Sequence, residues 1–148
     1  MQNCRWATIT NMSKSKIFSL PVRVYFQDTD AGGVVYHANY LNFMERARTE
    51  WLRTHGYSNA GLMKEFGVVF VVRSMKLDYL RPALLDDLLE VTAHIKDIGR
   101  SRLTILQTVR RGEEVLTEAE VHLVCVSLAS FKPASVPEVL RTQLEKLT

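Results

Sequence analysis

A chain of 148 residues is long enough for one domain, and 47% hydrophobic with 24% charged residues is the composition of a globular protein, not of a disordered or fibrous one. The net charge of +3 comes without a clustered Lys/Arg face, which argues against a nucleic-acid binder. Cys4 and Cys125 form no CxxC pair. The apolar runs are far shorter than the roughly 20 residues of a transmembrane helix, and no signal peptide is evident, so we expect a cytoplasmic protein without a transmembrane segment.

The N-terminal segment differs from the rest of the chain. Residues 1–16 show no periodicity and are rich in Ser, Thr, Asn and Lys, which predicts a disordered extension. Met12 is a candidate alternative start of translation. We expect residues 17–148 to form one domain, since no linker or internal repeat interrupts them.

The first regular segment is a predicted strand followed by a turn. From Phe18 to Gln27 apolar and polar residues alternate, as in a strand with one buried face. Asp28 and Asp30 then favour local side-chain bonding, and Gly32 and Gly33 permit backbone angles that a Cβ forbids. The residues expected on the core face of the strand are Val22, Val24 and Phe26.

A long helix follows the turn. Beyond His37 the apolar residues recur at spacings of three and four, which predicts a helix from about Asn39 to His55 that ends near Gly56. Its start is a candidate catalytic centre, because free N–H groups and the positive end of the helix dipole stabilise a nearby oxyanion. The apolar face consists of Tyr40, Phe43, Met44, Ala47 and Trp51, which we interpret as core.

The second half of the sequence has the two-residue alternation of antiparallel strands. A short helix is expected at residues 58–66, then four strands within residues 71–79, 89–96, 103–109 and 115–127. Ser135 to Glu138 resembles a capping box before a last short helix. The expected fold class is α+β, with a five-stranded antiparallel sheet wrapped around one long central helix.

The segment from Val22 to Tyr40, which reads VRVYFQDTDAGGVVYHANY, resembles the signature of the hotdog-fold acyl-CoA thioesterases related to 4-hydroxybenzoyl-CoA thioesterase. The similarity extends over about residues 18–135 and includes ERARTE at 45–50. Within this family it is most similar to the thioesterases associated with the bacterial Tol–Pal system. The resemblance implies hydrolysis of acyl-CoA to a free acid and coenzyme A. An aromatic acyl group is not implied, since Ala31 and His37 stand where the benzoyl-specific enzymes often carry Pro and Tyr.

The resemblance also implies roles for individual residues. The catalytic carboxylate falls on Asp30, as nucleophile or general base, and the oxyanion donor is a backbone N–H at or beside His37. No metal or other cofactor is expected, because a thiolate is already a good leaving group. The residues expected to bind substrate are Asp28, Gly33, Val34 and Tyr36, with Arg73 and Lys76 placed for the phosphates of coenzyme A.

Each of these roles has a plainer alternative. An Asp before a helix is most often a cap, and Asp28 is expected to orient the turn. For His37, the two interpretations are that it acts through its imidazole ring or only through its backbone N–H. Exposed basic strand residues such as Arg73 usually contact only water.

Two other functions remain open at this point, a hydroxyacyl dehydratase on the same fold and a non-catalytic module that binds acyl-CoA or acyl carrier protein. The dehydratase is disfavoured because the chain lacks its His-plus-acid pattern. The expected partners are the acyl-CoA substrate and further copies of the chain, as a homodimer or a homotetramer built as a dimer of dimers. Acyl carrier protein is a further candidate partner.

Overall fold

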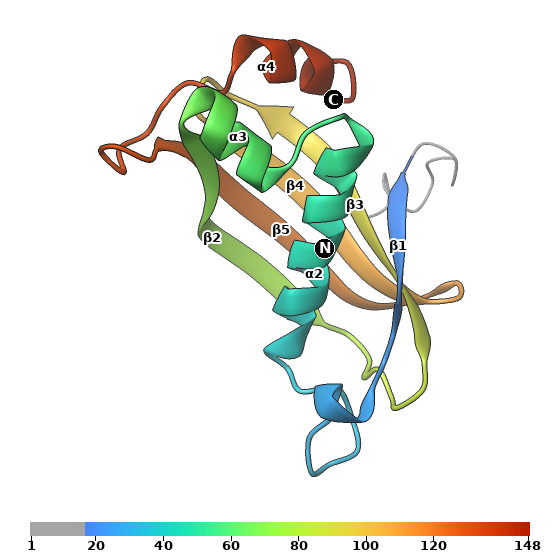
Figure 1. Ribbon diagram of the computed structural model, residues 1–148. Coiled ribbons are helices and arrows are strands. Elements are labelled where there is room, and N and C mark those ends of the chain that lie inside the picture. Colours follow the sequence, from blue (N-terminus) through green and yellow to red (C-terminus); the bar gives the residue numbers. More distant parts are fainter. Residues whose placement is uncertain (1–16) are drawn as a thin grey trace.

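The computed structural model describes residues 17–148, which form one antiparallel sheet around a long helix (Figure 1). The expected disordered extension, with Met12, lies outside the described residues. In chain order the strands are β1 (Phe18–Arg23), β2 (Val68–Tyr79), β3 (Leu88–Ile98), β4 (Arg102–Arg111) and β5 (Glu114–Ser127). Their order in the sheet is β1-β3-β4-β5-β2, and every neighbouring pair is antiparallel. The expected strand number and direction are therefore confirmed.

The core lies between the concave face of the sheet and helix α2 (Asn39–Thr54). The apolar stripe of the helix is buried as predicted, with Phe43, Met44 and Ala47 wholly inaccessible to solvent. Opposite them are the alternate residues of β3, such as Leu89 and Val91, which are equally buried. Burial of each large side chain contributes roughly 1.5–3 kcal/mol, so this one interface holds helix and sheet together.

The first strand is shorter than the alternation predicts. β1 ends at Arg23, and a 3₁₀ turn, Phe26–Asp28, follows. The placement of Phe26 on the core face is wrong, since its side chain is 83% exposed. The physical reason is local: the Tyr25 N–H donates to the Asp28 carboxylate, which turns the chain out of the sheet before Phe26.

Two short helices lie at one end of the molecule. Helix α3 (Asn59–Phe66) begins where it was expected, with the Ser58 hydroxyl accepting from the Gly61 N–H. Helix α4 (Glu138–Glu145) packs on the sheet end through buried Leu140 and Leu144. The predicted capping box is wrong: no side chain caps this helix, and the Ser135 hydroxyl accepts instead from Arg100.

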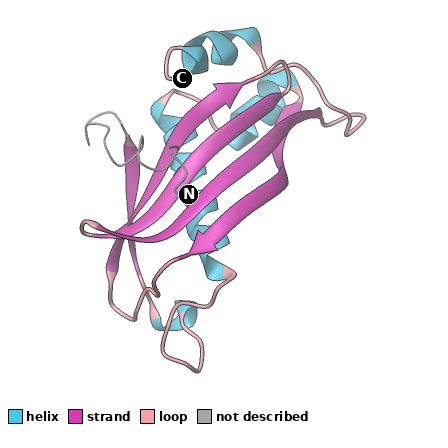
Figure 2. Cartoon of the chain, turned by 180° about the vertical axis from the view of Figure 1, so that it is seen from behind, coloured by secondary structure: helices cyan, strands magenta, loops and turns pink. Residues whose placement is uncertain are grey.

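Helices α2 and α3 lie over the same face of the sheet (Figure 1), and Figure 2 shows the opposite face of strands β2 to β5 turned toward the viewer. β2 is an edge strand that pairs only with β5, and its register shifts between Val72 and Ser74, which leaves Arg73 in a bulge. Within residues 17–148, every helix is too short or too polar to cross a lipid bilayer.

Candidate active site

The turn between β1 and α2 is a small hairpin of its own. The Tyr36 N–H donates to the Asp28 carbonyl, Thr29 pairs with Val35, and the Asp30 N–H donates to the Val34 carbonyl. These bonds bring the two arms of the loop together and leave Asp30 at its tip, at the base of α2 (Figure 1).

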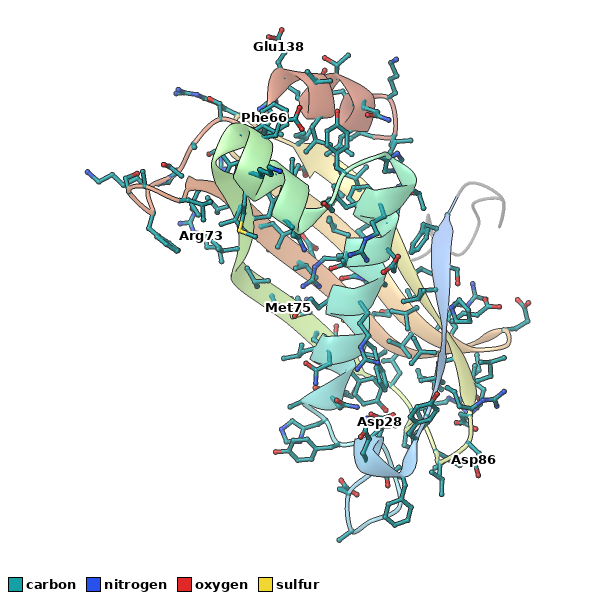
Figure 3. All side chains as sticks on the ribbon, in the orientation of Figure 1. Asp28, Phe66, Arg73, Met75, Asp86 and Glu138 are labelled. Atoms are coloured by element: carbon teal, nitrogen blue, oxygen red, sulfur yellow. The ribbon has the colours of Figure 1, made fainter. Side chains whose placement is uncertain are left out.

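Asp28 fastens this hairpin to the helix. Its carboxylate is 7% exposed and accepts two hydrogen bonds, from the Tyr25 N–H and from the Asn39 side-chain amide, each 2.8 Å long. Asn39 is the first residue of α2, so the carboxylate joins the end of β1 to the helix start (Figure 3 labels Asp28). This buried position supports the interpretation of Asp28 as the residue that orients the turn.

Asp30, in contrast, is exposed and makes one local bond, in which its Oδ1 accepts from the Gly32 N–H at 2.8 Å. A Cβ on Gly32 would lie 3.1 Å from that same oxygen, so the glycine leaves room for the carboxylate. Gly33 has φ +80°, a backbone conformation that favours glycine. The Gly32–Gly33 pair therefore shapes the tip of the loop so that Oδ1 of Asp30 is held by a hydrogen bond and Oδ2 is free to act.

The start of α2 offers free donors beside this loop. Among the described residues, no hydrogen bond uses the N–H of His37 or Ala38, and Ala38 caps the helix without a side-chain bond. The His37 carbonyl, in turn, accepts from the Tyr79 hydroxyl at the end of β2. Burial, and secondarily the neighbouring Tyr40, raises the pKa of Tyr79.

A hollow of about 300 Å³ lies beside the helix start, between it and the segment that follows β2. Its lining includes His37, Tyr40, Tyr79 and residues 80–82. The Tyr40 hydroxyl accepts a hydrogen bond from the Ala83 N–H, which fixes the segment at residues 80–82 on the far side of the hollow. Free N–H donors, an exposed carboxylate at the neighbouring loop tip and a hollow are the parts that an addition to a carbonyl group needs.

Comparison with known proteins decides the family. The sequence profile of the Thioesterase superfamily matches residues 32–118. Over 131 residues the chain is 47% identical to the acyl-CoA thioester hydrolase YbgC of Escherichia coli O6:H1, which covers 88% of this chain and 97% of the relative. The chain belongs to the thioesterase superfamily. The profile begins just after Asp30, whereas the similarity to the relative extends over most of the chain.

Other members of the thioesterase superfamily agree with this assignment. The acyl-CoA thioesterase YbgC of Haemophilus influenzae is 43% identical over 130 residues, which is 88% of this chain and 96% of the relative. The crystal structure of a probable thioesterase from Bartonella henselae has a TM-score of 0.79 at 38% identity, covering 82% of this chain and 99% of that one. The resemblance to the hotdog-fold thioesterases, in family and in fold, is confirmed.

Not all the residues expected to bind substrate lie at the helix start of this thioesterase-superfamily chain. Tyr36 does: its ring centroid lies 4.6 Å from that of His37. Arg73 instead lines a hollow on the opposite face of the sheet, together with Arg102 and His122. Lys76 is exposed on β2, where it pairs across the ladder with Glu120.

Two residues that the sequence did not suggest contribute to the site. Asn39 holds the Asp28 carboxylate, and Tyr79 holds the His37 carbonyl from a strand far along the chain. Asn39 lies within the family signature, so the motif itself marked this position. Tyr79 is an ordinary aromatic residue in a strand pattern, and only the three-dimensional fold shows its contact.

Exchanging the two groups of the Asp28–Asn39 pair tests its positioning role. Asp28→Asn places two amide donors against each other, and Asn39→Asp places two carboxylates together, so each single variant is expected to lose about 1–3 kcal/mol of stability and part of kcat. The double variant restores one donor and one acceptor. It should recover more than half of both losses, measured by urea unfolding and thiol-release kinetics. Additive losses in the double variant would contradict the pairing.

Proposed function

We propose that this chain hydrolyses acyl-CoA thioesters, with Asp30 as the catalytic carboxylate and the free N–H groups at the start of α2 as the oxyanion site. The observation that carries the proposal is an exposed carboxylate at the tip of a hairpin that is anchored to the helix start by Asp28 and Asn39. The relatives named acyl-CoA thioesterases support the substrate class.

In the proposed reaction, the thioester carbonyl oxygen accepts a hydrogen bond from the N–H of His37, which makes the carbonyl carbon more electrophilic. The Asp30 carboxylate then either attacks the carbonyl carbon, giving a mixed anhydride that water hydrolyses, or removes a proton from the water that attacks. The carbon–sulfur bond breaks and coenzyme A leaves as a thiolate. In this scheme the His37 ring only lines the site, and the backbone N–H of His37 is the group that takes part in the reaction.

Gly33, Val34 and Tyr36 are proposed to shape the acyl side of the same site. Gly33 forms the tip of the hairpin, and Val34 bridges to Leu84 and so fixes the second arm of the loop. Tyr36 is half-exposed beside the His37 ring, where an acyl group that approaches the helix start would touch it.

We further propose that Arg73 meets the phosphates of coenzyme A. Within residues 17–148 the side chains of Arg73 and Arg102 make no hydrogen bond or ion pair, and they line the same hollow, so their charges are available to an anion. β2 connects Arg73 to Tyr79 over about 20 Å at 3.3 Å per residue, which a substrate with a long flexible arm has to span. Lys76 has less support, because Glu120 lies opposite it.

Assembly and location stay proposals as well. The free edge of β2 suits pairing with a second copy of the chain, and we propose a homodimer that can form a dimer of dimers. We propose a cytoplasmic location on the sequence pattern and acyl carrier protein as a further partner, and a role with the Tol–Pal proteins is what the resemblance implies.

The activity is tested with a panel of acyl-CoA thioesters, aliphatic from short to long plus one aromatic, while a thiol-trapping dye reports released coenzyme A. We expect turnover on at least one thioester, and the panel then names the acyl class. Binding of acyl-CoA by calorimetry without any thiol release would contradict the proposal and support a non-catalytic binding module instead.

A further inference from the structure

A hydrogen bond joins the end of the edge strand β2 to the start of α2. Tyr79 is the last residue of β2, and its hydroxyl donates to the carbonyl of His37, which lies 42 residues earlier in the chain. His37 directly precedes Ala38, the N-cap residue of α2. The bond therefore holds the peptide unit at which the helix begins, beside the hollow that both His37 and Tyr79 line.

The Tyr79 ring is held in a defined direction although it is half-exposed. It meets the Tyr40 ring edge-on, with 5.4 Å between the ring centroids, and the centroid of the His37 ring lies 6.5 Å away. The backbone is fixed as well, because the next N–H along the chain, that of Leu80, donates to the Leu116 carbonyl. A hydroxyl on such a ring has little freedom to leave the His37 carbonyl.

The peptide unit that Tyr79 holds also carries a free donor. The His37 carbonyl and the Ala38 N–H belong to one planar peptide group, and a trans peptide points these two groups in opposite directions. Since the carbonyl is directed at the Tyr79 hydroxyl, the N–H is directed away from it. A hydrogen bond accepted by the carbonyl also polarises the peptide, which strengthens the N–H as a donor. Tyr79 therefore sets both the direction and the strength of this N–H.

The Ala38 N–H has no hydrogen-bond partner among the described residues, unlike its neighbours in the turn. The N–H of Tyr36 donates to the Asp28 carbonyl, and the N–H of Asn39 donates to the Tyr36 carbonyl. This leaves two consecutive free donors, the N–H groups of His37 and Ala38, at the positive end of the α2 dipole. An oxyanion is stabilised most when such donors are aimed at it before the reaction begins.

We propose that Tyr79 is a positioning residue for the oxyanion site, and that the Ala38 N–H, aimed by Tyr79, is a second donor to the thioester oxygen beside the N–H of His37. The inference rests on the proposed hydrolysis at the start of α2. Tyr79 acts through the peptide between residues 37 and 38 and needs no contact with the substrate. Because negative charge grows on the oxygen only as the carbonyl is attacked, loss of the Tyr79 bond affects turnover more than substrate binding.

Tyr79→Phe tests the role of the hydroxyl, because it removes this group and keeps the ring against Tyr40. In steady-state thiol release, on the thioester that the wild type hydrolyses best, we expect kcat to fall about tenfold and KM to stay within about twofold. The loss is smaller than the 10²–10³-fold that is typical of a missing oxyanion donor, because the N–H is still present but no longer aimed.

Tyr57→Phe is the matched control for the loss of a tyrosine hydroxyl. Within residues 17–148 the Tyr57 hydroxyl makes no hydrogen bond, and Tyr57 follows the opposite end of α2, which closes at Thr54. Its kcat should therefore equal that of the wild type.

An infrared measurement separates this role from a merely structural one. Acetonyl-coenzyme A, isotopically labelled at its ketone carbon, presents a carbonyl group that cannot be hydrolysed to a thiol. Hydrogen bonds to the ketone oxygen lower its stretching frequency, and we expect Tyr79→Phe to lose about half of the lowering that the wild type causes, since one of two donors is no longer aimed. A Tyr79 that only supported the fold would leave the frequency unchanged.

Ala38→Pro tests the donor itself. Ala38 has φ −73°, which proline adopts, and proline is tolerated at the first turn of a helix because the N–H that it lacks has no helical partner there. We expect kcat to fall about 10²–10³-fold while circular dichroism shows that the helix is retained. Should proline disturb the helix, Tyr79→Phe decides alone.

Thiol release by the wild type distinguishes failure of this inference from failure of the proposed hydrolysis. If the wild type releases no thiol from any thioester, the hydrolysis fails and the role of Tyr79 falls with it. If the wild type is active but Tyr79→Phe keeps more than half of its kcat, if the bound ketone absorbs at the same frequency in both proteins, or if a folded Ala38→Pro is fully active, the hydrolysis stands and the proposed role of Tyr79 is overturned.

Discussion

Replacement of Asp30 by Asn is expected to lower kcat on acyl-CoA by about 10²–10⁴-fold, the usual contribution of a positioned base. The amide keeps the oxygen that accepts from the Gly32 N–H, so the hairpin keeps its shape while the charge and basicity are lost. Since the side chain forms no other bond among the described residues, KM should change little. Steady-state thiol release, with substrate affinity measured by calorimetry, separates the two constants.

Asp86→Asn is the matched control for this substitution. Asp86 is an exposed Asp at the same end of the molecule, as Figure 3 shows, and its φ of 71° is one that Asn also tolerates. Its kcat should stay within about twofold of the wild type if Asp30 acts chemically. If both variants lose activity equally, the effect is one of general charge near the loop, and if Asp30→Asn keeps more than a tenth of kcat, the carboxylate is not the catalytic group.

The largest loss of stability is expected from Phe43→Ala. Phe43 is wholly buried between α2 and the sheet, with its ring centroid 6.2 Å from that of Tyr40 in an edge-on arrangement. Removing the ring leaves a cavity that the surrounding sheet cannot fill, so the free energy of unfolding should fall by about 3–5 kcal/mol. The thermal midpoint should then fall by about 10 °C.

Leu41→Ala in the same helix provides the comparison, because the Leu41 side chain is 42% exposed and a surface truncation usually changes stability by about 0.5 kcal/mol or less. Urea unfolding monitored by circular dichroism measures both variants. A Phe43→Ala loss below about 1 kcal/mol would mean that the helix does not pack on the sheet through this side chain.

Periodicity predicted most of the fold because each regular element buries one face. The helix at Asn39 and the strands of the second half follow their patterns closely. The two errors, Phe26 and Ser135, have one cause: a single side-chain hydrogen bond decided the local path, through Asp28 in one case and Arg100 in the other. Spacing in a sequence cannot show which of several acceptors a donor will meet.

The residues of the candidate site also fall into two groups, those that the sequence predicted and those that only the fold brings together. The resemblance led to Asp30 and His37, since both lie in one short motif, and the structure shows an exposed carboxylate and free N–H groups there. The contribution of Tyr79 depends on a strand that meets the start of α2 only after folding. Tyrosine is a common residue type in strand patterns, so nothing in the sequence marked it.

The strand order has a consequence for how the protein is made. The three central strands, β3 to β5, follow one another as hairpins, whereas β1 pairs with β3 from the opposite half of the chain, as in the match of Val22 to Leu89. Closing so long a loop costs entropy that only the finished sheet repays. On the ribosome, the hairpin that carries Asp30 is therefore synthesised early, but β1 has no β3 to pair with until more than half of the chain has emerged.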